Sequence, residues 1–392
     1  MNFSSLLQPH IQEFIAAHLE SDCTKIALKK NPFPNENYTE IINQINCKQR
    51  SKEKLPTWFQ TNNIIFPSKI AIEQTSSEIT AAYKASLIEG ETLFDATGGF
   101  GIDSYYFAKK IKKVIHCEAN VSLSELVNHN FSVLKSENCT CISGDSFEIL
   151  TKINQKFDWI YLDPSRRNET KGKVFLLSDC SPNISELQEF YHKYTDRILV
   201  KTAPLLDIHA GLLELKNVKT IHIIALENEV KELLWELDKN FEGSQKIITI
   251  NIQKNNNQVS EIELDRVYSP TYSLPQTYLY EPNVALLKSG YFDAVSEIFK
   301  VNKLHQNSHL YTSFECKDFQ GRRFKIDKIV PFQKNEIKKH LQNQKMNVST
   351  RNFPLKPEEI KKKYQIKDGG TIFAFFTTVL NNEKIVLLCT KI

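Results

Sequence analysis

The sequence predicts a doubly wound α/β domain, preceded by a helical unit and followed by small α+β units. Short apolar runs alternate with helical patterns at intervals of roughly 20 to 30 residues from Thr92 onward, which is typical of parallel strands joined by crossover helices. A glycine-rich turn follows the first run, as in nucleotide-binding domains. The 392 residues are 41% hydrophobic and 24% charged, which is enough apolar material for several cores and argues against disorder.

We assign residues 1–73 to a helical domain, because short helical patterns alternate there with proline-containing breaks. The first 20 residues lack a basic start and a cleavable apolar core, and they predict an amphipathic helix. A further helix is predicted over residues 73–87, with serines and threonines near its start as caps. No apolar run approaches the roughly 18 residues of a membrane span. We therefore expect a cytoplasmic protein with no membrane partner.

The α/β domain is predicted to span residues 74–268. Its six central strands are assigned to the apolar runs 92–95, 114–118, 139–142, 159–163, 197–201 and 220–225. Two more runs, 245–252 and 261–267, are compatible with an edge hairpin across a polar, asparagine-rich turn.

Two small domains are predicted after the proline-containing segment 269–275, at residues 277–320 and 321–392. The second is basic: residues 321–367 contain fourteen Lys and Arg against four Asp and Glu. Arginine is scarce in the chain, and we assign three arginines of this region to phosphate binding: Arg322, Arg323 and Arg351. Aromatic residues interleave with this charge as stacking faces or core residues: Phe324, Phe332, Phe353 and Tyr364. Residues 368–370 predict a turn into a buried strand.

The glycine-rich turn carries the first candidate site. It reads Asp-Ala-Thr-Gly-Gly-Phe-Gly, and we assign six of its residues to cofactor binding: Asp95, Ala96, Thr97, Gly98, Gly99 and Gly101. Glycines let the backbone turn sharply and approach a ligand closely. The pattern is neither GxGxxG nor a phosphate loop, because no lysine follows the last glycine. A leading acid with closely spaced glycines suits a ligand that carries an ammonium group and no phosphate.

Three more acids follow the next three predicted strands. Glu118 lies 23 residues after Asp95, where a carboxylate accepts the hydroxyls of a ribose. Asp145 and Ser146 follow the third strand and could face an adenine amino group, and Asp163 closes the fourth. Each acid alone could equally be a helix cap or a loop acid. Together they predict one crevice along the carboxyl edge of the sheet.

These motifs resemble the class I S-adenosylmethionine-dependent methyltransferases. The stretches LPTW (55–58), EQTSSE (73–78), VKTAPLLDI (200–208), NEVKELLW (228–235) and TRNFPL (350–355) are similar to a group of these enzymes with a C-terminal THUMP-like domain. The resemblance implies a Rossmann-like fold, S-adenosylmethionine as cofactor and, by analogy with THUMP domains, RNA such as tRNA or rRNA as partner. It also implies that the EQTSSE residues Gln74, Thr75 and Ser76 belong to the cofactor site.

The segment Asp-Pro-Ser-Arg-Arg after the fourth strand indicates the reaction type. Amino methyltransferases of nucleic acids carry an aromatic residue where this chain has Arg166, and C5 methyltransferases use a cysteine where residues 201–204 have none. Direct methyl transfer remains, with Asp163 and Arg166 as catalytic residues and Arg167 and Lys201 on the substrate. A salt bridge to a neighbouring helix is the alternative for the arginine pair.

Other functions stay open at this point. A methyltransferase of proteins or small molecules and a non-catalytic protein on the same scaffold are the alternatives to an RNA methyltransferase. The extended basic segment favours RNA, and the acids with the glycines favour a cofactor. The eight cysteines have no metal-ligand spacing, so we expect no metal site. The sequence leaves the oligomeric state open.

Overall fold

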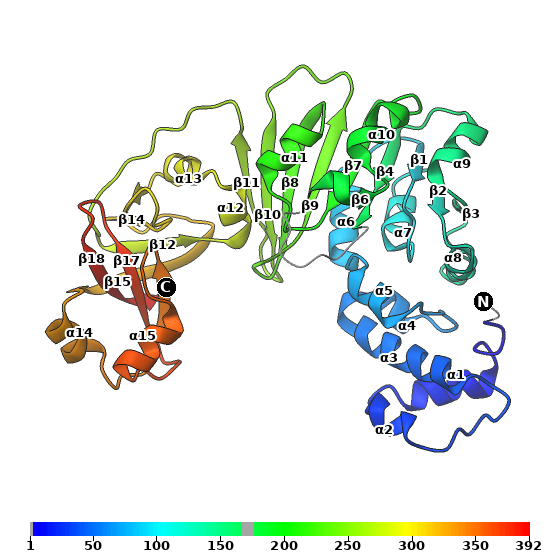
Figure 1. The fold of residues 1–392 in the computed structure, drawn as a ribbon, viewed down its shortest axis with the longest axis horizontal. Coiled ribbons are helices and arrows are strands. Elements are labelled where there is room, and N and C mark those ends of the chain that lie inside the picture. The colour runs from blue at the N-terminus through cyan, green and yellow to red at the C-terminus, as the bar shows by residue number, and fades with distance from the viewer. Residues whose placement is uncertain (1–2, 167–175) are drawn as a thin grey trace. The chain divides into compact units, whose positions relative to one another are not determined.

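The structure is a computed structural model that describes residues 3–166 and 176–392 (Figure 1). It divides into two compact units. The first contains Met1–Lys219 with Leu234–Glu242, and the second contains Thr220–Leu233 with Gly243–Ile392. No helix among the described residues is both long and apolar enough to cross a membrane.

The first unit begins with a helical bundle, drawn in blue in Figure 1. Its helices are α1 (Pro9–Ala17), α2 (Cys23–Ala27), α3 (Tyr38–Lys54), α4 (Pro56–Gln60) and α5 (Lys69–Gln74), as the helical pattern predicts. Trp58 of α4 is fully buried and packs edge-on against Tyr105 of helix α7 (Ile102–Ala108) at 4.9 Å between ring centroids. The bundle therefore packs against the helix that follows the glycine-rich turn.

The predicted helix over residues 73–87 is wrong at its start. Helix α5 ends at Gln74, Thr75 and Ser77 have extended backbone, and helix α6 covers Glu78–Ser86. Ser77 caps α6 by accepting a hydrogen bond from the Thr80 backbone N–H at 3.1 Å. A serine side chain competes for backbone donors inside a helix and satisfies them at its start, which explains the break.

The sheet of the first unit has the order β9-β7-β4-β1-β2-β3. Its strands are β1 (Thr92–Asp95), β2 (Lys113–Glu118), β3 (Cys139–Ser143), β4 (Trp159–Leu162), β7 (Arg197–Thr202) and the end of β9 (Glu229–Asp238). The β1–β2, β1–β4, β2–β3 and β4–β7 pairs are parallel. Crossover helices connect the strands: α7, α8 (Val121–Val133), α9 (Ser146–Ile153), α10 (Ile184–Tyr191) and α11 (Ile208–Glu214). The predicted doubly wound fold is confirmed.

A short ribbon branches from the end of β4. Strand β5 (Ser165–Arg166) pairs antiparallel with β6 (Cys180–Ser181). A 3-10 turn at Leu177–Asp179 directly precedes β6. Arg167 lies outside the described residues.

The second unit contains two sets of strands. In the first set β10 (Lys246–Ile252) pairs parallel with β8 (Val218–Leu226) and antiparallel with β11 (Gln258–Glu263). The predicted edge hairpin is confirmed, but its second strand covers Gln258–Glu263 and not the predicted residues 261–267. The second set is a seven-stranded sheet in the order β13-β14-β12-β15-β18-β17-β16. Its strands are β12 (Tyr278–Pro282), β13 (Asn302–Lys303), β14 (Tyr311–Ser313), β15 (Gly321–Pro331), β16 (Asn347–Arg351), β17 (Ile372–Thr378) and β18 (Lys384–Lys391). Its helices are α12 (Val284–Ser289), α13 (Phe292–Phe299), α14 (Lys334–Leu341) and α15 (Pro357–Tyr364).

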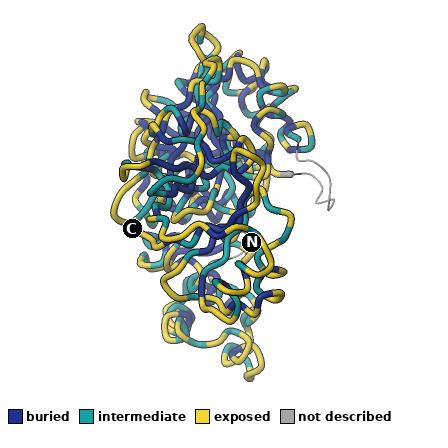
Figure 2. Tube along the Cα trace, turned by 90° about the vertical axis from the view of Figure 1, so that its left-hand side faces the viewer, coloured by how far each residue is buried: buried dark blue, intermediate teal, exposed yellow. Residues whose placement is uncertain are grey.

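The seven-stranded sheet buries a core on each face, because neighbouring residues of a strand point to opposite faces. Phe376 packs with Ile337 of α14 and Ile360 of α15, whereas Phe375 packs with Leu279 and Leu310. Figure 2 shows the buried residues of the chain in dark blue and the exposed residues in yellow. All four aromatic residues predicted as stacking faces or core residues belong to these two cores or pack against them: Phe324, Phe332, Phe353 and Tyr364.

Candidate active site

Backbone hydrogen bonds join the loops after strands β1 and β3 to the carboxyl ends of the neighbouring strands β2 and β4. The N–H of Ala96 donates to the carbonyl of Tyr161 at 2.9 Å, and the N–H of Gly98 donates to the carbonyl of Cys117 at 2.8 Å. The N–H of Gly144 donates to the carbonyl of Glu118 at 3.0 Å. The predicted cofactor residues after β1, β2 and β3 and the predicted catalytic Asp163 after β4 thus lie at one edge of the sheet, as the strand order requires.

Two glycines of the turn are required by close packing. A Cβ atom on Gly98 would lie 2.3 Å from Nε2 of the buried His116. Gly101 has φ +79° and starts helix α7, and a Cβ there would lie 2.7 Å from Cγ1 of Val127. Any side chain at either position would displace the turn, so its shape depends on glycine.

The two acids predicted to bind the ribose and the adenine also hold the local backbone. Glu118 accepts hydrogen bonds from the N–H groups of Gly99 at 2.9 Å and Asn120 at 2.7 Å, one on each carboxylate oxygen. Asp145 caps helix α9, and both of its hydrogen bonds, to Phe147 and Glu148, use Oδ1. Carboxylate oxygens have about two acceptor sites each, so both acids keep capacity for a ligand.

Asp95 is a buried carboxylate that accepts one hydrogen bond on each oxygen. Its Oδ1 accepts from the Thr97 N–H at 3.1 Å and its Oδ2 from the Ser104 hydroxyl at 2.5 Å. Burial raises the pKa of Asp95 to about 7, and the negative charges of Asp103 and Asp163 add to the rise. A cation bound next to Asp95 would restore the ionised form, which is what the ammonium group of a ligand provides.

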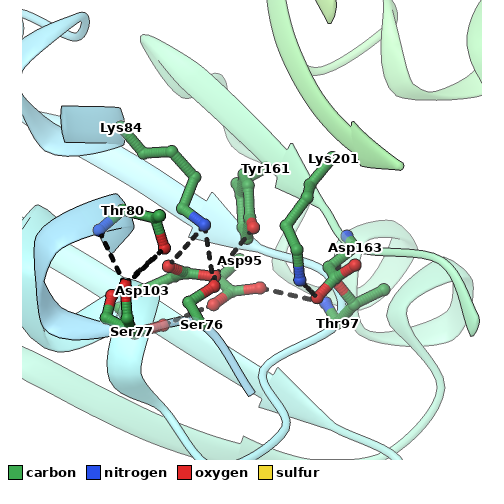
Figure 3. Close-up of polar contacts among 11 residues, drawn as sticks. Ser76, Ser77, Thr80, Lys84, Asp95, Thr97, Asp103, Tyr161, Asp163 and Lys201 are labelled. Carbon is green, nitrogen blue, oxygen red and sulfur yellow. Dashed lines mark hydrogen bonds and ion pairs between the residues drawn. The ribbon is translucent and has the colours of Figure 1, made fainter. Parts of the chain in front are cut away.

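A buried polar cluster, which we call the Lys84 cluster, lies beside the turn and was not predicted (Figure 3). It consists of Ser76, Lys84, Asp103 and Tyr161. Lys84 is fully buried, and its Nζ is 3.0 Å from Oδ1 of Asp103 and 2.7 Å from the Ser76 hydroxyl, to which it donates. The Ser76 and Tyr161 hydroxyls donate to Oδ2 of Asp103 at 2.9 and 2.8 Å. Burial opposes the ionisation of Asp103, but the Lys84 ammonium holds its pKa below the usual range.

The Lys84 cluster gives the EQTSSE segment a structural role, and its assignment to the cofactor site stays a prediction. The Ser76 hydroxyl donates to Asp103 and accepts from Lys84, so its interactions fix the segment between α5 and α6. Gln74 is exposed and Thr75 is half-buried. A signal for Lys84 was present in the sequence, because it lies four and three residues after the buried Thr80 and Ala81, on the same face of α6.

Asp163 and Lys201 form an ion pair at the same edge. The Lys201 ammonium contacts Oδ2 of Asp163, and their side chains are 12% and 35% exposed for lysine and aspartate respectively. The Asp163 backbone N–H donates to the Thr97 hydroxyl at 2.6 Å, which links the strand-four motif to the glycine-rich turn. Figure 3 shows Lys201 and Asp163 pointing toward one another next to Thr97. The partly exposed carboxylate is therefore positioned from two sides.

The arginines predicted to bind RNA have a partner in the second unit. Nε of Arg322 donates to Oε2 of Glu281 at 2.6 Å, and Nη2 of Arg351 donates to Oε1 of Glu281 at 2.7 Å. The Glu281 side chain is 4% exposed. Arg323, next to Arg322, is half-buried. Two of the three arginines thus compensate one buried carboxylate.

The residues at the carboxyl edge fit S-adenosylmethionine. The buried carboxylate of Asp95 is matched to a cation, a Cβ position on Gly99 is open with only the Thr97 carbonyl oxygen 3.7 Å away, and Glu118 retains acceptor capacity. Among residues 3–166 and 176–392, no group of three His, Cys, Asp or Glu side chains is arranged to hold a metal ion.

The fold and this edge define a class I methyltransferase domain, and comparisons with known proteins agree. A solved structure from Porphyromonas gingivalis W83, described as a methyltransferase, matches with a TM-score of 0.87 and 30% identity, covering 100% of this chain and 99% of that chain. The family profile described as THUMP domain-like matches residues 321–391, and a profile described as a ferredoxin-like domain matches residues 278–319. The chain belongs to the family of methyltransferases with a C-terminal THUMP-like domain.

Two curated relatives share a shorter segment with this chain. They are described as uncharacterized RNA methyltransferases of Clostridium acetobutylicum and Clostridium tetani, and they are 34% identical over 79 residues and 31% identical over 97 residues. The matches cover 20% and 24% of this chain and 17% and 21% of the relatives. This chain thus spans about a fifth of the length of the curated relatives it matches.

Proposed function

We propose that the chain uses S-adenosylmethionine to methylate a base in RNA, such as tRNA or rRNA, by direct methyl transfer. One observation carries the proposal: the glycine-rich turn, the buried Asp95 and the Asp163–Lys201 pair meet at one edge of the sheet. The match to a THUMP domain-like profile and the short matches to proteins described as RNA methyltransferases support RNA as the substrate.

The residues of the edge divide into two groups. Asp95 would hold the ammonium group of the cofactor, and the backbone of the glycine-rich turn would approach the cofactor closely. Glu118 would bind its ribose, and Asp145 with Ser146 would bind its adenine. When bound, the cofactor supplies a methyl group that a sulfonium already makes electrophilic. The chain then has to position the acceptor and take up its proton, and we assign proton removal to the Asp163 carboxylate, which Lys201 positions. Arg166, which we also assign to catalysis, lies three residues after Asp163 in β5.

The proposed function is tested by methyl transfer from radiolabelled S-adenosylmethionine. Purified chain is incubated with total RNA from cells with and without the gene. We expect label in RNA from cells without the gene and little label in RNA that is already modified. Label in a protein or small-molecule fraction, with none in RNA, would show that the substrate is a protein or a small molecule and not RNA.

Cofactor affinity should depend on the ionisation of Asp95. Because the pKa of Asp95 is about 7 in the free protein, binding of a cation below pH 7 must release a proton. We expect affinity to fall by up to about tenfold per pH unit below pH 7. Asp95→Asn should abolish this dependence and weaken binding by roughly 10- to 150-fold, the loss of a charged hydrogen bond. Calorimetry between pH 5.5 and 7.5 measures both effects.

The same substitution should raise the stability of the protein without cofactor. A raised carboxyl pKa means that the folded state binds the proton more tightly than the unfolded chain, so stability is lost as pH rises from about 4 to about 7. Asp95→Asn removes this loss, and denaturation at pH 8 should show a more stable variant. A less stable variant with unchanged cofactor binding would contradict the role of Asp95.

RNA affinity should depend on exposed lysines of the THUMP-like domain. Lys338 and Lys339 on α14, and Lys362 and Lys363 on α15, are exposed. If they bind phosphates, replacing each pair by glutamine should weaken RNA binding. The log–log salt slope on single strands should fall by about 0.7 for each phosphate that the variant no longer neutralises. Filter binding at several salt concentrations measures the slope.

The matched control replaces two exposed lysines of the first unit, Lys152 and Lys156. This pair should leave the salt slope unchanged. Arg322 and Arg351 are unsuitable for this test, because their loss leaves Glu281 buried and uncompensated. Equal slopes for all variants would show that the lysines of α14 and α15 are only solvated.

A further inference from the structure

The second unit contains a pocket of about 720 Å³ that no part of the proposed reaction uses. Its walls come from the segment before β12, the start of α13 and the loop after β13. A ligand pocket of this volume accommodates a small organic molecule or one nucleotide. The lining includes Arg266, Tyr272, Asp293, Lys303, Gln306 and His309.

Aromatic rings form much of the pocket wall. Tyr272 is 38% exposed, and Tyr291 and Phe292 are half-buried. The ring of Phe292 stacks on His309, with centroids 3.5 Å apart and planes 21° apart. Flat, accessible rings around a cavity offer stacking faces to a planar ligand.

The charges of the pocket are compensated within the protein. Lys303 is nearly buried, its Nζ lies 2.5 Å from Oδ1 of Asp293, and the same ammonium lies 5.7 Å from the Tyr272 ring centroid. Arg266 forms an ion pair with Glu297. A phosphate site would offer its cations to the ligand, whereas these cations are already paired with carboxylates.

His309 adds no charge near neutral pH. Burial lowers its pKa to about 4, and the positive charges of Lys303 and Arg351 act in the same direction, with Asp293 opposing. Gln306 and Asn307 are exposed and line the pocket, and their amide groups are the uncharged donors and acceptors that recognise base edges. The pocket therefore suits a neutral, flat heterocycle with hydrogen-bonding edges.

We propose that this pocket binds one unpaired nucleobase of RNA, stacked against Tyr272 and hydrogen-bonded at its edge by Gln306 and Asn307. Sequence-specific RNA recognition commonly uses unpaired bases on aromatic side chains. The inference deepens the proposed function and rests on RNA as the substrate. It assigns base binding to this pocket and leaves phosphate binding to the lysines of α14 and α15.

The test measures binding of an eight-nucleotide single-stranded RNA to the full chain without cofactor, by fluorescence anisotropy. Tyr272→Ala should weaken binding by about 5- to 150-fold, the range for loss of one stacked base. Tyr272→Phe retains the ring and should bind like the wild type. Phe314→Ala is the matched control, because Phe314 is 73% exposed and does not line the pocket.

An abasic strand of the same length separates the base from the backbone. The wild type should bind it as weakly as Tyr272→Ala binds the normal strand. Equal affinity of wild type and Tyr272→Ala for the normal strand, or no RNA binding by the wild type, would overturn the pocket assignment. Tyr272-dependent binding without any methyl transfer to RNA would retain the pocket and refute the proposed reaction, so the two failures are distinguishable.

Discussion

Lys84→Met is expected to lower the free energy of unfolding by about 3 to 5 kcal/mol, because it leaves the buried Asp103 carboxylate without its cation. Lys84 is fully buried. The Ser76 and Tyr161 hydroxyls donate hydrogen bonds to Asp103, but they are neutral and do not replace the positive charge of Lys84. Denaturant unfolding measures the change. Asp103→Asn in the Lys84→Met background should recover part of the loss, since the amide removes the unpaired charge.

The matched control is Lys112→Met. Lys112 pairs with Glu91, but their side chains are 74% and 67% exposed, so the expected change is about 0 to 1 kcal/mol. If Lys84→Met costs no more than Lys112→Met, the Lys84 cluster does not stabilise the fold beyond an ordinary surface pair.

Asp163→Asn is expected to reduce turnover by about 10² to 10⁴-fold, the usual contribution of a general base. Cofactor affinity should change little, because the Asp163 backbone N–H still binds the Thr97 hydroxyl and the Asp95 carboxylate is retained. Single-turnover methyl transfer and cofactor calorimetry together separate the two effects.

Asp196→Asn is a suitable control, since Asp196 is exposed and precedes β7, at the opposite end of that strand from Lys201. It should retain wild-type turnover. Unchanged turnover in Asp163→Asn would exclude Asp163 as the base, and the reaction would then need only positioning by its neighbours.

The strands that position the site could be predicted because each is a short apolar run bounded by turn residues. Strand β9 was not predicted: its residues Glu229–Asp238 are rich in Glu, Lys and Leu, which favour helices, and burial of Leu233, Leu234 and Trp235 in the sheet overrides that preference. The acids of the site could be located by their places after successive strands, since the parallel order fixes where strand ends meet.

The pairings within the site could not be predicted. Lys84, Asp103 and Tyr161 come from α6, α7 and β4, and only the folded chain brings them into contact. The charge count of residues 321–367 likewise cannot distinguish an arginine that binds Glu281 from a lysine that faces water. Composition reports how many charges are present, and tertiary structure determines which of them are already compensated.

The pairing of β12 with β15 has a consequence for how the C-terminal part can be divided. Leu279 lies opposite Phe324 and Tyr280 opposite Arg323, so the segments matched by the ferredoxin-like and THUMP domain-like profiles form one continuous sheet. Gly321 is part of the contact between β12 and β15, because a Cβ there would lie 2.1 Å from the Glu281 carbonyl oxygen. Truncation of the chain before Gly321 would leave the edge of β12 without its partner β15, and an unpaired strand edge promotes aggregation. These two segments are therefore expected to fold and to be expressed only together, as a single structural unit.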